Sequence, residues 1–284
     1  MKSLCLYASY VHGKGISYYS SVYLKELKNK FSDVIYLHSN ELDSLANDFF
    51  KVQGIETKLV SNDGFDFGKW QKIMNDVDLT SYEQLVLVND SCVLFAPLNN
   101  VIAWFNNSGL DFGGLTSSMV PKNHIQSYFL MFNKITFNEL VYFFKKNSAT
   151  NNIHEVIEHF EIGLSQYLLS KNFKCGSFLS NDGYAGEFSP YYQCVNSHII
   201  QGSPMIKKKI LFSSYRKDEL FTLARMNFNI KVKPYLHLIA KCNQTLIISF
   251  DELFKHEKNK MSLFVLFKYT ITRFSIYLYR QFNK

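Results

Sequence analysis

The chain has 284 residues, of which 47% are hydrophobic and 19% are charged. This is ordinary globular composition, and it excludes an intrinsically disordered chain. The net charge of +7 favours a polyanionic partner, and it does not choose among a nucleic acid, an anionic membrane surface and a phosphorylated substrate.

The cysteines exclude two further kinds of protein. Their number, five, is odd and no C-x-x-C pair occurs, so neither a disulfide framework nor a structural zinc site is indicated. The first ten residues hold an apolar run that is too short for the core of a signal peptide. We therefore expect a cytoplasmic protein, because that compartment keeps thiols reduced.

The first part of the chain alternates predicted strands and helices. Apolar runs predict strands over residues 3–9, 34–37, 57–60 and 85–88, and helical periodicity predicts helices over 18–30 and 67–77. This order favours a doubly wound α/β fold, in which a mostly parallel sheet carries helices on both faces.

The predicted strand at 85–88 ends in three polar residues, Asn89, Asp90 and Ser91. Four consecutive apolar residues are typical of a central strand buried on both faces. Ligands of such sheets bind outside the carboxyl ends of the strands, so Asp90 is placed to meet a substrate or a metal ion. The triplet alone leaves a simple strand-ending turn open, because these residues are also common in turns.

The second part predicts one more strand and several helices. The strand is at 128–132, and a capping box from Thr136 to Glu139 predicts the start of a helix. Helical periodicity returns at 153–160, and Glu161 continues that helix or opens a new one. A carboxylate that only stabilises a helix N-terminus remains an alternative for Glu161. Residues 176–250 look loop-rich, with a strand-like run at 245–250.

The C-terminal segment 261–284 is apolar and aromatic but is interrupted by Lys268, Arg273 and Arg280. These charges argue against a membrane span. Two alternatives stay open: an interfacial helix with a basic edge, and a helix docked on the domain.

Polar loops at 62–66, 89–91 and 111–116 are expected to meet at one edge of the sheet. A carboxylate beside such loops suits a divalent ion that carries a diphosphate, because Mg²⁺ and Mn²⁺ prefer oxygen ligands. Neither G-x-G-x-x-G nor G-x-x-x-x-G-K-[ST] occurs, which disfavours a nicotinamide dehydrogenase or a P-loop NTPase.

Six separated segments together resemble the rhamnan synthesis protein F family, in the expected order: residues 62–70, 86–91, 111–116, 124–132, 161–169 and 203–207. The resemblance spans about residues 4–211. It implies a GT-A-like nucleotide-sugar transferase domain over 1–211, followed by a C-terminal helical extension over 212–284. Members of this family are regarded as glycosyltransferases of bacterial surface polysaccharides, including lipopolysaccharide.

The resemblance also implies roles for single residues. Asp90 looks like the carboxylate retained from a metal-binding D-x-D, and Glu161 resembles the catalytic base of inverting enzymes. His198 is loosely similar to a late metal-binding histidine. Gly113 stands where the family pattern has a tryptophan, which suggests an altered pocket. The remaining implied contacts are with the nucleotide sugar, at Asn62, Gly64, Asp66, Asn89, Ser91, Asp111 and Lys207, and with the acceptor or sugar, at Thr116, His124 and Gln126.

The implied activity is inverting transfer of a sugar from a nucleoside-diphosphate donor to a hydroxyl of a polysaccharide precursor, with Mn²⁺ or Mg²⁺ as cofactor. Family membership suggests rhamnose as the sugar, dTDP-rhamnose as a donor and a lipid-linked glycan as acceptor, and no nucleic acid. The enzyme would then lie peripherally at the inner face of the cell membrane. A retaining transferase, another donor sugar, or a non-catalytic module that binds glycan or nucleotide are the alternatives.

Overall fold

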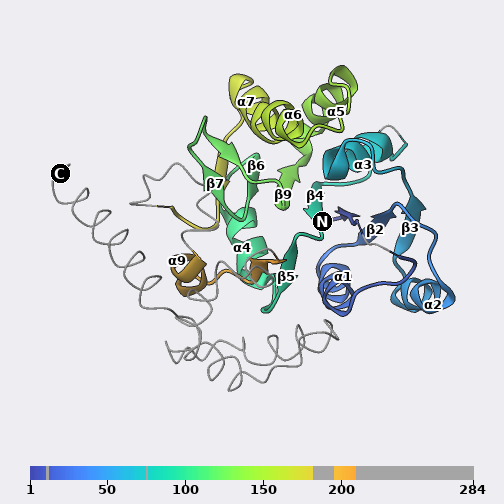
Figure 1. The fold of residues 1–284 in the computed structure, drawn as a ribbon. Coiled ribbons are helices and arrows are strands. Elements are labelled where there is room, and N and C mark those ends of the chain that lie inside the picture. The colour runs from blue at the N-terminus through green and yellow to red at the C-terminus, as the bar shows by residue number, and fades with distance from the viewer. Residues whose placement is uncertain (11–12, 75, 182–194, 209–284) are drawn as a thin grey trace, which may run out of the picture. The chain divides into compact units, whose positions relative to one another are not determined.

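The computed structural model describes residues 1–10, 13–74, 76–181 and 195–208 (Figure 1). The predicted strand at 245–250 and the C-terminal extension, including its basic helix at 261–284, lie outside the described residues. Within the described part, no helix is both long and apolar enough to cross a membrane.

A seven-stranded sheet forms the centre of the fold, with the strand order β10-β6-β9-β4-β1-β2-β3. Among these strands, β9 runs antiparallel to both of its neighbours, β4 and β6, and all other neighbouring pairs are parallel. The predicted mostly parallel sheet is therefore confirmed. The strand bounds are β1 Ser3–Ala8, β2 Asp33–His38, β3 Glu56–Leu59, β4 Gln84–Asn89, β6 Phe112–Gly114, β9 Phe129–Asn133 and β10 Cys175–Ser177.

Helices cover both faces of this sheet, as the doubly wound prediction requires. In Figure 1, α3, α5, α6 and α7 lie on one side, and α1, α2 and α4 lie on the other. The helix bounds are α1 Tyr18–Lys30, α2 Ser44–Gln53, α3 Phe65–Met74, α4 Asn99–Asn107, α5 Phe137–Lys146, α6 Ile153–Val156, α7 Gly163–Ser170 and α9 Val195–Ile200, with a 3₁₀ turn at Lys134–Thr136 and a π-helix, η2, at Ile157–Ile162.

The two central strands, β1 and β4, are buried along their whole length. Alternate side chains enter opposite faces, so Leu6 and Leu87 belong to the core cluster that includes Trp70 of α3. On the other face, the Tyr7 ring meets Tyr23 of α1 edge to face, with ring centroids 5.5 Å apart. Burial on both faces explains why these strands read as continuous apolar runs.

Two sequence expectations about helix ends are wrong. The helix predicted at 67–77 is α3, which begins at Phe65 and ends at Met74. The capping box predicted at Thr136 is also absent, because the Thr136 hydroxyl donates to the Asn133 carbonyl oxygen at 2.8 Å instead. Thr136 therefore belongs to the 3₁₀ turn that precedes α5, where its side chain serves the preceding backbone.

Two small antiparallel sheets complete the described fold. Strand β5 (Cys92–Leu94) pairs with β11 (Met205–Lys207), and β7 (Ser117–Ser118) pairs with β8 (His124–Ile125). The first sheet brings a late segment of the chain back to the end of β4. Because β5 begins two residues after Asp90, this pairing places Lys207 and Lys208 beside the polar triplet.

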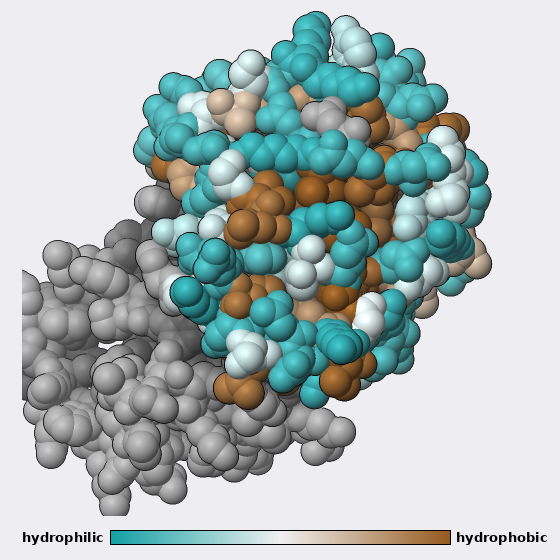
Figure 2. Space-filling model, turned by 90° about the vertical axis from the view of Figure 1, so that its right-hand side faces the viewer, coloured by the Kyte–Doolittle hydropathy of each residue, from teal (hydrophilic) through white to brown (hydrophobic). Residues whose placement is uncertain are grey.

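Helix α2 and the edge strand β3 carry some exposed apolar side chains. Leu45, Val52 and Leu59 are 79%, 78% and 62% exposed. Figure 2, which shows the molecule from the right-hand side of Figure 1, has hydrophobic areas set among hydrophilic ones. Scattered apolar side chains are normal on protein surfaces, so we assign no function to this face.

Candidate functional site

Asp90 lies at the point where the strand order of the sheet reverses. The chain runs from β1 outward to β2 and β3, and then returns to form β4 on the opposite side of β1. The Asp90 N–H donates to the Ala8 carbonyl oxygen at 3.1 Å, and the Ser9 hydroxyl donates to Asp90 Oδ2 at 3.3 Å. Such a switch point opens a crevice at the carboxyl ends of the strands, where α/β proteins bind ligands.

The residues on either side of Asp90 stabilise the turn, and their predicted contacts with the nucleotide sugar stay predictions. Asn89 Oδ1 accepts from the Ser91 N–H at 3.1 Å and from the Ser91 hydroxyl at 2.6 Å. Asn89 Nδ2 donates to Asp66 Oδ2 at 2.7 Å. The polar groups of Asn89 are therefore engaged within the protein, and they fix the direction of Asp66.

Asp66, in the first turn of α3, is a second carboxylate at the same place. Desolvation, followed by the negative charge of Asp90, raises the pKa of Asp66 to about 6. From the family resemblance, Asp90 was expected to be the carboxylate retained at the metal site, and Asp66 was expected at the nucleotide. In the structure the two carboxylates are close enough for one to affect the ionisation of the other.

Three lysines surround these carboxylates. Lys208 Nζ lies 3.2 Å from Asp90 Oδ2, Lys207 Nζ donates to the Ser91 hydroxyl at 3.1 Å, and Lys69 Nζ donates to Asn62 Oδ1. Lys69 is fully buried. Desolvation lowers the pKa of Lys69, against the opposing charges of Asp66 and Asp90. The pKa of Lys208 is raised, because Asp90 and Tyr19 outweigh the desolvation of its ammonium.

Lys69 and Lys208 were not among the site residues that the sequence predicted. A signal for Lys69 was available, because it follows Asp66 by three residues and so shares its helix face. We call the resulting group the switch-point cluster; its members are Asp66, Lys69, Asn89, Asp90, Lys207 and Lys208.

The donor set of this cluster fits a hard divalent cation. Asp66 and Asp90 offer carboxylate oxygens, and Mg²⁺ or Mn²⁺ is commonly held by one or two carboxylates, with phosphate and water in the remaining positions. In the part of the chain that the structure describes, no three His, Cys, Asp or Glu side chains gather into a metal site. A metal here would therefore depend on substrate oxygens for much of its coordination.

The loop before α3 has a packing role. Gly64 has a φ of +77°, and its N–H donates to Asn151 Oδ1 at 2.9 Å. A Cβ on Gly68 would lie 1.8 Å from the Asp63 carbonyl oxygen, so only glycine allows the backbone to pass this closely. Asn62 instead contacts the cluster through Lys69. The predicted nucleotide contacts of Asn62 and Gly64 stay predictions.

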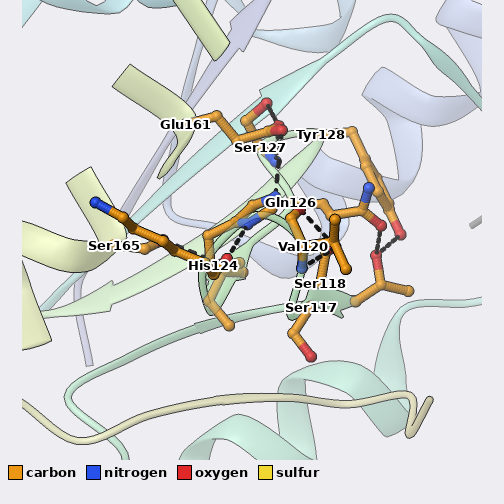
Figure 3. A network of polar contacts seen from close by, with 12 residues as sticks. Ser117, Ser118, Val120, His124, Gln126, Ser127, Tyr128, Glu161 and Ser165 are labelled. Atoms are coloured by element: carbon orange, nitrogen blue, oxygen red, sulfur yellow. Dashed lines mark hydrogen bonds and ion pairs between the residues drawn. The ribbon is translucent and has the colours of Figure 1, made fainter. Parts of the chain in front are cut away.

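Glu161 lies on the other part of the site, where it faces the segment that follows β8. Glu161 Oε2 accepts from the Ser127 N–H at 2.8 Å and from the Ser127 hydroxyl (Figure 3). His124 Nε2 lies 3.7 Å from Glu161 Oε1. The two donors from Ser127 hold the carboxylate in a fixed direction through Oε2. The other oxygen, Oε1, has only the longer contact with His124 among these three.

The backbone that carries Glu161 differs from the expectation. Glu161 lies inside the π-helix η2, between α6 and α7, and does not open a helix. The alternative that Glu161 only stabilises a helix N-terminus is therefore wrong. Single π-turns inside helices are frequent at functional sites.

The three residues predicted for the acceptor or sugar pocket are brought together in one buried network. The Thr116 hydroxyl donates to Gln126 Oε1 at 2.8 Å and also contacts the Tyr128 hydroxyl, while His124 lies next to Glu161. Thr116 is fully buried, so it supports the network rather than lining a pocket. We call this group the hairpin network; its members are Thr116, His124, Gln126, Ser127, Tyr128 and Glu161.

Tyr128 joins the two groups. Lys207 Nζ lies 4.3 Å from the centre of the Tyr128 ring, and the Asn89 N–H donates to the Tyr128 carbonyl oxygen at 3.4 Å. The preceding residue, Ser127, holds Glu161. A single two-residue segment therefore connects the carboxylate of the hairpin network to the cations of the switch-point cluster.

Asp111 does not lie where the sequence analysis placed it. It precedes β6, and its neighbour Phe112 pairs with Phe132, which in turn pairs with Leu85 near the start of β4. Asp111 is therefore at the amino edge of the sheet, opposite Asp90. Its Oδ2 accepts from the Lys174 N–H at 2.7 Å, so the carboxylate stabilises the backbone just before β10.

His198 lies on α9, buried, with Nε2 2.8 Å from Asn181 Oδ1. Burial lowers the pKa of His198 to about 4. Asn181 also donates to the Ser117 carbonyl oxygen, so this contact ties α9 to β7. The predicted role of His198 as a metal ligand stays a prediction.

Gly113 is packed between strands and a helix. A Cβ at this position would lie 2.8 Å from the Gly176 carbonyl oxygen and 3.3 Å from the Phe105 ring of α4. This fold has no room for a tryptophan there unless the backbone moves. The glycine is therefore explained by the approach of β10 and α4 to β6, without reference to a sugar pocket.

Comparison with known proteins gives one family. The family described as rhamnan synthesis protein F matches residues 37–259, which is more than half of the chain. Two relatives, both described as virulence protein VirA of Vibrio anguillarum, are 28% identical to this chain over 183 residues, which cover 61% of this chain and 58% of the relative. The match thus spans about 58% of the length of these curated relatives.

Solved structures with a related arrangement are more distant. A cytidylyltransferase from Leptospira borgpetersenii is 15% identical, with a TM-score of 0.42 over 87% of this chain and 97% of that one. An inositol-1-phosphate CTP transferase from T. maritima is 11% identical, with a TM-score of 0.40 over 62% of this chain and 84% of that one. At these values the likeness carries no argument about chemistry.

Proposed function

The chain belongs to the rhamnan synthesis protein F family, and from this premise we propose that it is a glycosyltransferase that uses a nucleoside-diphosphate sugar. The observation that carries the proposal is the junction at Ser127 and Tyr128. Ser127 holds the Glu161 carboxylate, and Tyr128 contacts Lys207 and Asn89 of the switch-point cluster. Transfer of a sugar from a diphosphate needs both parts: a proton acceptor and charge to receive the leaving group.

The donor diphosphate would lie in the switch-point cluster. Lys207 would offer an ammonium group there, and Asp66 and Asp90 would hold a divalent cation. When bound, that cation would offset the charge that builds on the departing diphosphate. Asn62, which contacts Lys69, would lie toward the nucleotide.

Glu161 would take the proton of the acceptor hydroxyl. The Ser127 N–H and hydroxyl fix Oε2, so Oε1 is directed to receive the proton. The acceptor hydroxyl would attack the anomeric carbon from the side of Glu161, while the diphosphate held at Asp90 would leave from the opposite side. Such an attack inverts the configuration of the anomeric carbon. The His124 imidazole lies beside Oε1 and would interact with the changing charge of Glu161 as the proton arrives.

The finer features of the proposal come from the family. We propose rhamnose as the sugar, a lipid-linked precursor of a surface polysaccharide as acceptor, residues 1–211 as the transferase domain and 212–284 as an extension that contacts the inner face of the membrane. Removal of 261–284 should then reduce cosedimentation with anionic vesicles. Equal sedimentation of the full and shortened chains would contradict the membrane contact.

The test of the activity is a panel of nucleotide sugars, screened for thermal stabilisation with and without Mn²⁺ and then assayed for transfer. A donor that binds only the folded state raises its apparent stability. Transfer with inverted stereochemistry supports the proposal, and retained stereochemistry assigns the retaining alternative. Stabilisation without any transfer or donor hydrolysis would instead assign a binding module.

A further inference from the structure

Lys208 is the cation that directly contacts Asp90. Its Nζ lies 3.2 Å from Asp90 Oδ2, and the two side chains are only 20% and 12% exposed. Its Nζ also lies 3.2 Å from the Tyr19 hydroxyl and 4.7 Å from the centre of the Tyr19 ring. The ammonium therefore lies between α1 and the end of β4, in contact with one of the two carboxylate oxygens that Asp90 could offer to a metal ion.

The backbone of Lys208 is fixed while its side chain can move. The Lys208 N–H donates to the Ser91 carbonyl oxygen at 2.8 Å, directly after the pairing of β11 with β5. A lysine side chain has four carbons and a strongly hydrated point charge, so it can exchange partners without any movement of the main chain.

The charges of the cluster favour such an exchange. Asp66 and Asp90 contribute two negative charges, and Lys69, Lys207 and Lys208 contribute three positive charges, which leaves one positive charge in excess. A divalent cation that approached Asp90 Oδ2 would meet the Lys208 ammonium at contact distance, and like charges so close repel strongly. A diphosphate, by contrast, offers that ammonium a new anionic partner.

We propose that the Lys208 ammonium pairs with Asp90 in the ligand-free protein and transfers to the diphosphate of the donor on binding, which frees Asp90 for the metal. The proposal rests on the proposed function, because it takes the donor to be a nucleoside diphosphate. Its consequence is thermodynamic: metal and diphosphate each raise the affinity of the site for the other. Lys208 is thus a positioning residue that couples the two ligands.

The test measures Mn²⁺ binding directly, by the electron paramagnetic resonance signal of the free ion, with Mn²⁺ alone and with dTDP added. For the parent chain we expect dTDP to tighten Mn²⁺ binding by about fivefold or more, after correction for the Mn²⁺ that dTDP binds in buffer. Lys208→Met should bind Mn²⁺ alone more tightly than the parent by a similar factor, and dTDP should then tighten Mn²⁺ binding by a smaller factor than it does in the parent.

Two further variants make the outcome specific. Lys134→Met removes another lysine of an ion pair, 2.8 Å from Glu83 Oε1, and should behave as the parent does. Asp90→Asn should abolish the tighter Mn²⁺ binding when it is combined with Lys208→Met. Unchanged or weaker Mn²⁺ affinity in both Lys208→Met and Lys208→Gln, each checked for folding by circular dichroism, would overturn the proposal.

The Mn²⁺-only measurement separates this proposal from the proposed function. It needs neither a nucleotide nor transfer, so a gain in affinity in Lys208→Met stands even where no nucleotide sugar is found to react. Transfer by the parent together with equal Mn²⁺ binding in parent and Lys208→Met would keep the proposed function and overturn the role of Lys208.

Discussion

The switch-point cluster and the hairpin network lie side by side but are built on opposite principles. The first gathers two carboxylates and three ammonium groups, and the second holds one carboxylate, Glu161, among hydroxyl, amide and imidazole groups. Charged groups of both signs suit a partner that brings its own large charge, whereas fixed neutral donors suit a single proton acceptor whose direction matters. In the proposed function, this difference is the reason for placing the diphosphate at the first group and the acceptor hydroxyl at the second.

The largest expected effect tests the hairpin network. Glu161→Gln keeps the shape of the side chain but removes the proton acceptor, so transfer should fall by about 10²–10⁴-fold while donor binding is retained. The matched control is Glu158→Gln, an exposed residue of the same π-helix, which should transfer as the parent does. Full transfer by Glu161→Gln would break the comparison, because Glu161 would then not be the base.

The next effect tests the switch-point cluster. Asp90→Asn should lower transfer by about 10²-fold, because one charged contact that favours the transition state is lost. It should also weaken Mn²⁺ binding, unlike Glu161→Gln. Asp78→Asn, in the exposed turn at Thr80, serves as the control. If transfer and its Mn²⁺ dependence were the same in parent and Asp90→Asn, the cluster would not be the donor site.

A smaller effect tests the junction of the two groups. Tyr128→Phe leaves the ring under Lys207 but removes the hydroxyl that Thr116 contacts, so a buried polar group loses a partner. We expect a loss of about 1–3 kcal/mol in the free energy of unfolding, measured with denaturant. The half-exposed Tyr142 supplies the control, and Tyr142→Phe should change stability little. Equal stability of the two variants would show that the junction does not depend on this hydroxyl.

The smallest effect concerns pH. The pKa of Asp66 is about 6 in the folded state and 3.8 for an ordinary aspartate. Between these two pH values the folded state therefore holds a proton that the unfolded state has lost. Stability from this group is present below about pH 4 and is lost as the pH rises to about 6. In metal-free buffer, Asp66→Asn should match the parent near pH 4 and exceed its melting temperature above pH 6.

His198 acts in the opposite direction over the same range, because its pKa is lowered to about 4 and its protonation destabilises the fold as the pH falls. His198 is present in both proteins, so the difference between Asp66→Asn and the parent isolates Asp66. If the difference in melting temperature between Asp66→Asn and the parent were the same at pH 4 and pH 7, the raised pKa of Asp66 would be contradicted. Asp90 would then not affect the ionisation of Asp66.

The sequence alone determined five of the seven strands of the sheet and the position of Asp90; it did not predict β6 and β10. Continuous apolar runs identified β1 and β4, because a strand buried on both faces needs apolar residues at every position. The polar triplet after 85–88 then had to lie at the carboxyl end of a central strand. The order of six separated segments identified the family, and its match over residues 37–259 confirms that resemblance.

Only the tertiary structure decided which side chains meet. Asp66 reaches Asn89 across 23 positions of the chain, and Lys208 reaches Asp90 across 118, through the pairing of β11 with β5. Asp111 was expected beside Asp90 but lies at the opposite edge, because it precedes its strand instead of following it. Local periodicity indicates whether a residue is in a strand or a helix. Which loops meet at one edge of the sheet depends on the order and direction of the strands, and these are set by contacts between distant segments.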